Sequence, residues 1–208
     1  DPFLELIYKH ADVTPGVMKC FLNSCMLNKL QNVVWYVHIG IDIHLYNDEA
    51  LLTACKFGSL KVAKFLHALG ANIHVNNDEC FIKACETKNF NLLIWLYSVG
   101  ANIHASNEAP IRYACSRGSL YIAKWLHSVG ADIHVNNEEL LLNACKRGYL
   151  DVAEWLYSVG ADIHVNNEMI LKKTPLIDFE MVVWLYSKGA NISVDNEKIL
   201  RDACRREN

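Results

Sequence analysis

A glycine returns about every thirty residues along most of this 208-residue chain, and that period limits the folds the chain can adopt. One residue is missing from the last interval of the series Gly40, Gly70, Gly100, Gly130, Gly160 and Gly189. The phrase VGADIHVNNE occurs twice, at 129–138 and at 159–168. A fixed period of about 20 to 50 residues indicates copies of one supersecondary unit, which must stack on their neighbours to bury an apolar core.

Each thirty-residue repeat predicts a first helix that follows an asparagine. Asn137, directly followed by Glu138, shows the pattern. We interpret the asparagine as an N-cap that accepts from a free backbone N–H, and the acid as a charge favoured at the positive end of the helix dipole. We expect Gly148 and its counterparts Gly58 and Gly118 to end the first helix in the left-handed conformation.

A second helix follows in each repeat and has the pattern of a half-buried helix. In YLDVAEWLYSV, helical spacing joins Leu150, Ala153, Trp155 and Leu156 into one predicted apolar stripe. The helix should stop at the Gly-Ala dipeptide, where Gly160 can take a positive φ without steric cost. The DIHVN segment after it is predicted to be an extended finger, too short for a strand of a sheet.

The segment GADIHVNNEELLLNACKRGYLDVAEWLYSVGADIH, at 130–164, resembles the ankyrin repeat. The resemblance covers nearly the whole chain and implies an all-α fold, an ankyrin-repeat solenoid of stacked helix–turn–helix units with short finger loops. Two departures are that the period is thirty residues rather than about 33, and that Asn-Asp-Glu or Asn-Asn-Glu replaces the Thr-Pro-Leu-His segment of the family. This thirty-residue variant resembles the ankyrin proteins that giant DNA viruses of amoebae encode in large numbers.

The repeat divides the chain into a single predicted array, 1–208. Six full repeats are expected at 11–40, 41–70, 71–100, 101–130, 131–160 and 161–189. Residues 1–10 match the second helix of a truncated repeat, and 190–208 a truncated terminal repeat, so we expect a longer parent protein. In the sixth repeat Pro175 should end the first helix near Lys173.

Composition narrows the possible functions. A net charge of -3 does not indicate a nucleic-acid-binding balance, and no apolar run is long enough for a membrane helix. Because five cysteines follow the thirty-residue spacing, we read them as small packing residues of a reduced, intracellular chain: Cys25, Cys55, Cys85, Cys115 and Cys145. Without any nucleophile, phosphate-loop or metalloprotease motif, we expect no enzyme, no cofactor and no metal.

One histidine per finger forms a column, namely His44, His74, His104, His134 and His164. Stacked helices lie roughly 10 Å apart, which is too far for two of these rings to share a zinc ion. In the ankyrin family this position is usually an asparagine that ties neighbouring turns together, and we predict the same role here. The alternative is an array that loosens at about pH 6. A second column is predicted to be a core stripe: Trp35, Phe65, Trp95, Trp125, Trp155 and Trp184.

The resemblance implies that a partner binds at the fingertips and on the exposed side of the first helices, which line a concave groove. The candidate residues there are Tyr46, Lys56, Phe57, Lys83, Arg112, Tyr113, Arg117, Lys146 and Arg147, with Lys172 and Lys173 continuing the basic series. Aromatic rings among cations are typical of binding hot spots, although cations near helix C-termini also simply complement the dipole.

We therefore predict a protein-interaction scaffold whose protein partner has an acidic or mixed surface. It would be an adaptor or host-modulating factor, a monomer, in the host cytoplasm and not inserted in a membrane. The alternative is a groove for polyanions, either nucleic acid or lipid headgroups, although nucleic acid is not the expected partner.

Overall fold

The structure of the chain is a computed structural model that describes residues 15–174 and 179–191. The predicted helix at 1–10 and almost all of the predicted terminal repeat at 190–208 lie outside the described residues. The described part of the chain consists of helices and turns and contains no strand, as the sequence predicts.

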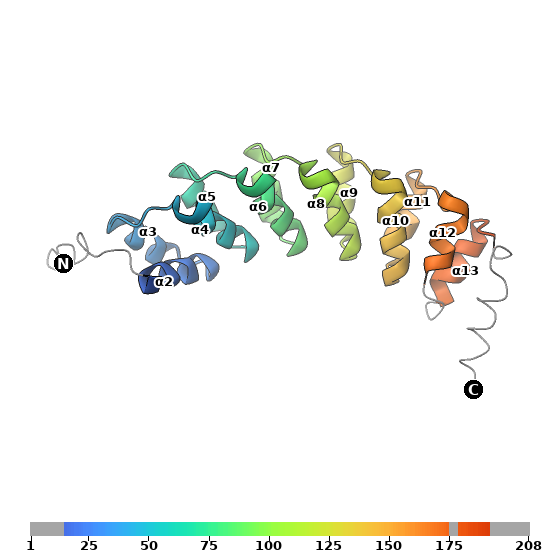
Figure 1. The fold of residues 1–208 in the computed structure, drawn as a ribbon, viewed down its shortest axis with the longest axis horizontal. Helices are drawn as coiled ribbons and strands as arrows, with labels where there is room; N and C mark the ends of the chain where they lie inside the picture. The colour runs from blue at the N-terminus through green and yellow to red at the C-terminus, as the bar shows by residue number, and fades with distance from the viewer. Residues whose placement is uncertain (1–14, 175–178, 192–208) are drawn as a thin grey trace, which may run out of the picture. The chain divides into compact units, whose positions relative to one another are not determined.

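The helices follow one another in pairs (Figure 1). The first helices of the pairs are α2 (Pro15–Met26), α4 (Leu45–Lys56), α6 (Val75–Glu86), α8 (Ala105–Ser116), α10 (Val135–Arg147) and α12 (Val165–Lys173). The second helices are α3 (Leu30–His38), α5 (Leu60–Ala68), α7 (Phe90–Ser98), α9 (Leu120–Ser128), α11 (Leu150–Ser158) and α13 (Phe179–Ser187). None of these helices is both long and apolar enough to cross a membrane.

The contacts divide the chain into two compact units, an N-terminal unit (Asp1–Ser106) and a C-terminal unit (Asn107–Asn208). In the N-terminal unit α2 packs on α4, α4 on α6, and α3 on α5. In the C-terminal unit α10 packs on α12, and α9 on α11. First helices therefore stack on first helices and second helices on second helices within each unit. The six repeat boundaries given above stay a prediction.

The core of each pair follows from the apolar spacing of the two helices. In α10 and α11, the fully buried side chains are Leu141, Ala144, Cys145, Val152, Ala153 and Leu156. Removing a leucine-sized side chain from water is worth roughly 1.5–3 kcal/mol. The predicted stripe of α11 is right except at one position, because Val152 is buried where Leu150 was expected and Leu150 is only half-buried.

The periodic cysteines are buried packing residues, as predicted. Cys25, Cys55, Cys85, Cys115 and Cys145 have no exposed surface. Burial raises the pKa of the Cys25 and Cys115 thiols to about 12, so both stay protonated and unreactive at neutral pH.

The ends of the first helices confirm two sequence predictions. Gly148 caps α10 in the left-handed conformation, with φ 72°. Lys88 takes the same place after α6 with φ 59°, so the left-handed turn forms even without glycine. As Pro175 predicts, α12 ends at Lys173, and Thr174 is already extended with φ −70° and ψ 130°.

The aromatic column is less buried than predicted. Trp155 and Trp184 are buried, but Trp35 is 41% exposed and Phe65, Trp95 and Trp125 are half-buried. Trp95, Trp155 and Trp184 each make a T-shaped contact with a ring of the preceding second helix. The centroids are 5.8 Å apart in His67–Trp95, 5.9 Å in His127–Trp155 and 6.0 Å in Tyr157–Trp184. Trp35 instead contacts Tyr36 of its own helix, at 5.0 Å.

Candidate protein-interaction surface

The fingers are turns rather than extended segments. In the finger before α10, the side chain of Asp132 accepts a hydrogen bond of 2.8 Å from the backbone N–H of His134. Three consecutive residues then have left-handed dihedrals: Asn136, Asn137 and Glu138, with φ of 51°, 60° and 64°. The corresponding residues at the starts of α4 and α6 have the same conformation. The prediction of an extended DIHVN finger is therefore wrong, because an Asx turn and a left-handed turn fold the segment back.

The N-cap interpretation of the asparagine is also wrong. The N-cap residue of α10 is His134, which makes no side-chain cap hydrogen bond, and Asn137 lies inside the left-handed turn. The acidic residue after the asparagine does lie in the first turn of its helix, as the sequence predicts. Glu138 and its counterparts Asp48 and Asp78 are all buried.

Each of these buried acids binds the histidine of its own finger. His134 Nδ1 lies 2.7 Å from Glu138 Oε1, and His44 Nδ1 lies 2.9 Å from Asp48 Oδ1. The hydrogen bond to Glu138 is the main reason that the pKa of His134 is raised, and the Glu138 and Asp132 charges add to it. The histidine column therefore fastens each turn internally, which corrects the prediction that these rings tie neighbouring turns together. No group of three metal-ligating side chains occurs among the described residues.

Asparagines instead make the bonds between neighbouring fingers. In the N-terminal unit, Asn47 Nδ2 donates to Asn76 Oδ1 at 3.0 Å, and Asn77 Nδ2 donates to Ser106 Oγ at 2.9 Å. In the C-terminal unit, Asn107 Nδ2 donates to Asn136 Oδ1 at 3.1 Å. The asparagine of one finger thus donates to the tip residue of the next finger. The sequence signal for this ladder is the asparagine that recurs in each repeat, which the pattern alone predicts to be an N-cap.

Tyr46 is the exception among the tip residues. It has a left-handed φ of 54° and is 74% exposed. The tips of the later fingers are Asn76, Ser106, Asn136 and Asn166, all with positive φ. Asparagine tolerates this conformation better than a bulky side chain does. The tyrosine therefore occupies a strained position without burying its ring.

We call the exposed side chains of the fingertips and first helices the first-helix face. In the N-terminal unit this face includes Phe57, which is 53% exposed directly after α4, with the Lys56 ammonium 5.8 Å from its ring centroid. On the neighbouring α6, Lys83 Nζ pairs with Glu86 at 3.1 Å. Tyr46 and Phe57 lie at opposite ends of α4, so the structure does not bring these two rings together.

In the C-terminal unit the first-helix face includes residues of α8 and α10. Arg112 is half-buried and its guanidinium binds Glu139 of α10 at 3.0 Å, so it is part of an internal bridge and not an open cation. Tyr113 is 37% exposed, and Arg117 lies at the surface after α8. Lys146 and Arg147 are exposed in the last turn of α10.

The structure also reveals a thiol pair that spacing alone did not suggest. Cys80, outside the thirty-residue series, lies within hydrogen-bonding reach of Cys55 on the adjacent helix, and both are fully buried. That hydrogen bond, together with burial, raises the pKa of the Cys55 thiol. The pair packs α4 against α6, and the raised pKa keeps the Cys55 thiol protonated at neutral pH.

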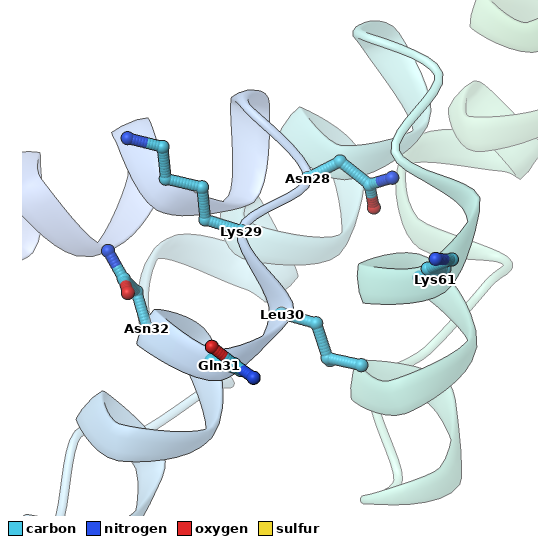
Figure 2. Close-up of a pocket in the computed structure, with 6 residues that line it drawn as sticks. All are labelled: Asn28, Lys29, Leu30, Gln31, Asn32 and Lys61. Atoms are coloured by element: carbon cyan, nitrogen blue, oxygen red, sulfur yellow. The ribbon is translucent and has the colours of Figure 1, made fainter.

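An open pocket lies at the turn between α2 and α3 and the start of α5. Figure 2 shows its lining residues: Asn28, Lys29, Leu30, Gln31, Asn32 and Lys61. Lys29 and Lys61 lie on opposite sides of the pocket in this view. The polar groups do not converge on one point, so the pocket lacks the arrangement that a small-molecule site requires.

Comparison with known proteins identifies the fold. Residues 81–167 match the family model of ankyrin repeats in three copies. The fold is an ankyrin-repeat fold. The crystal structure of the human ASB11 ankyrin repeat domain aligns with a TM-score of 0.69 and 20% identity, over 83% of this chain and 84% of that chain. Comparison with curated proteins finds no match.

The ankyrin-repeat fold bears on function at a general level. Ankyrin repeats generally mediate protein–protein interaction, and the fold is typically a non-enzymatic binding scaffold. On such a fold, specificity lies in the side chains that vary from one repeat to the next. In this chain those side chains include the tip residue at Tyr46 and the helix-end residues of the first-helix face.

Proposed function

We propose that this chain is a protein-interaction scaffold that binds a protein partner through the groove expected along its first-helix face. The contact residues of this proposal are the predicted ones with exposed side chains: Tyr46, Lys56, Phe57, Tyr113, Arg117, Lys146 and Arg147. Lys83 and Arg112 support the face through their ion pairs with Glu86 and Glu139.

Tyr46 is the observation that carries this proposal. The left-handed conformation costs more conformational free energy for a tyrosine than for the asparagines that occupy three of the later tips. Its ring is 74% exposed, so it gains little burial in return. Strained, exposed aromatic residues are favoured where a partner buries them, and tyrosine is enriched among residues that dominate binding energy.

The biological setting is a further part of the proposal. The thirty-residue variant resembles ankyrin proteins of giant DNA viruses of amoebae, so we place the chain in the host cytoplasm as a monomeric adaptor or host-modulating factor. Its partner would be a host protein with an acidic or mixed surface.

Affinity capture from an amoebal lysate tests the proposal. The intact chain would be compared with a Tyr46→Ala, Phe57→Ala variant and with a matched control, Tyr121→Ala, which truncates a 51% exposed tyrosine on the second helix α9. We expect a protein that is captured by the intact chain and the control and lost with the double variant. Equal capture by all three chains would place the binding surface elsewhere.

The alternative function is polyanion binding through the basic residues of the first helices. Because Lys83 and Arg112 are already paired with acids, fewer of these cations are open than the sequence indicates. Salt dependence separates the two functions. Polyanion binding should weaken steeply between 50 and 200 mM salt, roughly tenfold for each two or so phosphates contacted, whereas a packed protein interface should change little.

A further inference from the structure

The unpaired positive charge of the first-helix face is concentrated at one place in the C-terminal unit. The last turn of α10 carries Lys146 and Arg147, and the last turn of its packed neighbour α12 carries Lys172 and Lys173. All four side chains are exposed, and none has an acidic partner among the described residues. We call these four residues the basic cluster.

The basic cluster differs from the other helix ends. The last turn of α4 carries Lys56 alone, and the last turn of α6 carries a lysine that Glu86 neutralises. The last turn of α8 carries no basic residue, and one arginine, Arg117, follows it directly. One cation at a helix C-terminus complements the dipole. Four on two adjacent helices repel one another, and an anionic partner would remove that repulsion.

The spacing of the cluster follows from the early end of α12. Lys172 lies thirty residues after Leu142, so it occupies the position in its repeat that Leu142 occupies on α10. Leu142 precedes Lys146 by about one helical turn. The lysine pair of α12 is therefore offset by one turn, along the helix axis, from the basic pair of α10. With neighbouring helices 8–10 Å apart and one turn of 5.4 Å, the two pairs are separated by roughly 10 Å. An extended peptide advances about 3.3 Å per residue, so acidic pairs about three residues apart would reach both pairs of cations.

We propose that the basic cluster binds an extended acidic segment of a protein partner, with two pairs of carboxylates about three residues apart. This inference rests on the proposed function and names the chemistry that one part of the face recognises. A short protein segment fits better than a nucleic acid, because four cations on two adjacent helix ends match a few carboxylates, while the chain as a whole has a net charge of -3.

A direct binding measurement tests the proposal with the intact chain. The first probe is a fluorescein-labelled peptide, Gly-Ser-Glu-Glu-Ser-Glu-Glu-Ser-Gly, and the second has glutamine at all four glutamate positions. We expect fluorescence anisotropy to show binding of the first and not of the second. Lys172→Glu with Lys173→Glu should weaken binding of the first peptide about tenfold or more, because like charges then face each other.

A matched control has the same total charge as the Lys172→Glu, Lys173→Glu variant. Lys61→Glu with Lys64→Glu makes the same charge change on exposed lysines of the second helix α5 and should leave peptide affinity unchanged. Equal loss in both double variants would show general charge attraction and overturn the proposal. Circular dichroism of both variants confirms that each remains folded.

A third probe, a fluorescein-labelled twelve-nucleotide oligothymidine, distinguishes the polyanion alternative. Tighter binding of the oligonucleotide than of the acidic peptide, lost in the Lys172→Glu, Lys173→Glu variant, would assign the cluster to polyanions and overturn the proposal. If the peptide fails to bind but lysate capture still depends on Tyr46 and Phe57, the acidic-segment proposal fails and the proposed function stands. If the peptide binds but lysate capture does not depend on Tyr46 and Phe57, only the assignment of these two residues to the binding surface is wrong.

Discussion

At the residue scale, the finger of α10 depends on the contact between a buried acid and a half-exposed histidine. Glu138 is buried beside the half-exposed ring of His134, and its second oxygen, Oε2, has no hydrogen-bond partner among the described residues. Leaving a buried carboxylate without a partner is costly. The carboxylate therefore relies on the imidazole, and it holds the pKa of His134 above its ordinary value.

The free energy of unfolding should therefore rise as the solution is acidified from pH 8.5 to pH 6. A histidine whose folded-state pKa is raised contributes stability that is fully present below its unfolded pKa, about 6.5, and is lost as pH rises through the folded value. Urea denaturation at the two pH values measures the difference, and His134→Gln should reduce it. This expected rise in stability is opposite to the loosening near pH 6 that the histidine column suggests from the sequence. A chain that is less stable at pH 6 than at pH 8.5 would contradict the prediction.

The strain at Tyr46 makes a second prediction. Tyr46→Asn places at this tip the residue that three later tips carry in the same conformation. Relief of the left-handed strain should raise the free energy of unfolding by about 0.5–1 kcal/mol, as measured by urea denaturation. The same variant should lose the captured partner. A destabilised variant would show that Tyr46 has a structural role in the turn.

At the element scale, each first helix from α4 to α10 is followed by a left-handed residue that returns the chain into its second helix. Gly118 has φ 64°, and a Cβ built on it would lie 2.8 Å from Cδ1 of Tyr149 in the next repeat. Both the backbone conformation and the neighbouring ring therefore favour glycine. At Lys88 a side chain is present in the same conformation, which shows that the conformation alone is tolerated.

Gly118→Ala should consequently destabilise the chain by about 1–2 kcal/mol from the left-handed penalty, with a further cost from the contact with Tyr149. The double variant with Tyr149→Ala separates the two causes in a double-mutant cycle. We expect a favourable coupling energy in that cycle, since the second change removes the clash. A coupling energy near zero would mean that the ring moves aside freely.

The sequence predicts the helices better than the fingers. The thirty-residue period, the left-handed caps and the end of α12 follow from glycine, proline and apolar spacing, which act within one or two turns of a helix. The fingers could not be predicted in this way, because the bonds of Asn107 and Glu138 are made in a left-handed turn. An Asn-Glu pair before an apolar run fits a helix N-terminus equally well. Lys83 looked open although Glu86 lies three residues later on the same helix, a spacing that permits an ion pair. Arg112 looked open because the nearness of Glu139, on the next first helix, is not visible in the repeat pattern.

At the scale of the whole molecule, stability is expected to be local. In each compact unit the helices pack on the partner helix of their own pair and on the corresponding helix of the neighbouring repeat, so the contacts are local along the chain. In such an array stability is approximately a sum of repeat stabilities and nearest-neighbour terms. A core change in one unit should therefore weaken that unit most.

Leu141→Ala removes a fully buried side chain of α10 and should cost about 2–5 kcal/mol. Hydrogen exchange followed by mass spectrometry should show lost protection in α10 to α12, whereas α2 to α4 keep their rates. Leu51→Ala, a fully buried leucine of α4, is the matched control and should give the converse pattern. Uniform loss of protection along the chain in both variants would indicate a single cooperative unit.

The ladder between fingertips has a consequence for how such a chain can grow during evolution. Asn107 donates to the finger that follows, and the tip residue Asn136 accepts from the finger that precedes it. A gene segment that encodes one whole repeat carries both halves of this bond. Its duplication therefore adds a repeat whose polar groups find partners at once, with no compensating mutation. The identical phrases at 129–138 and 159–168 are what a duplication of that kind leaves behind.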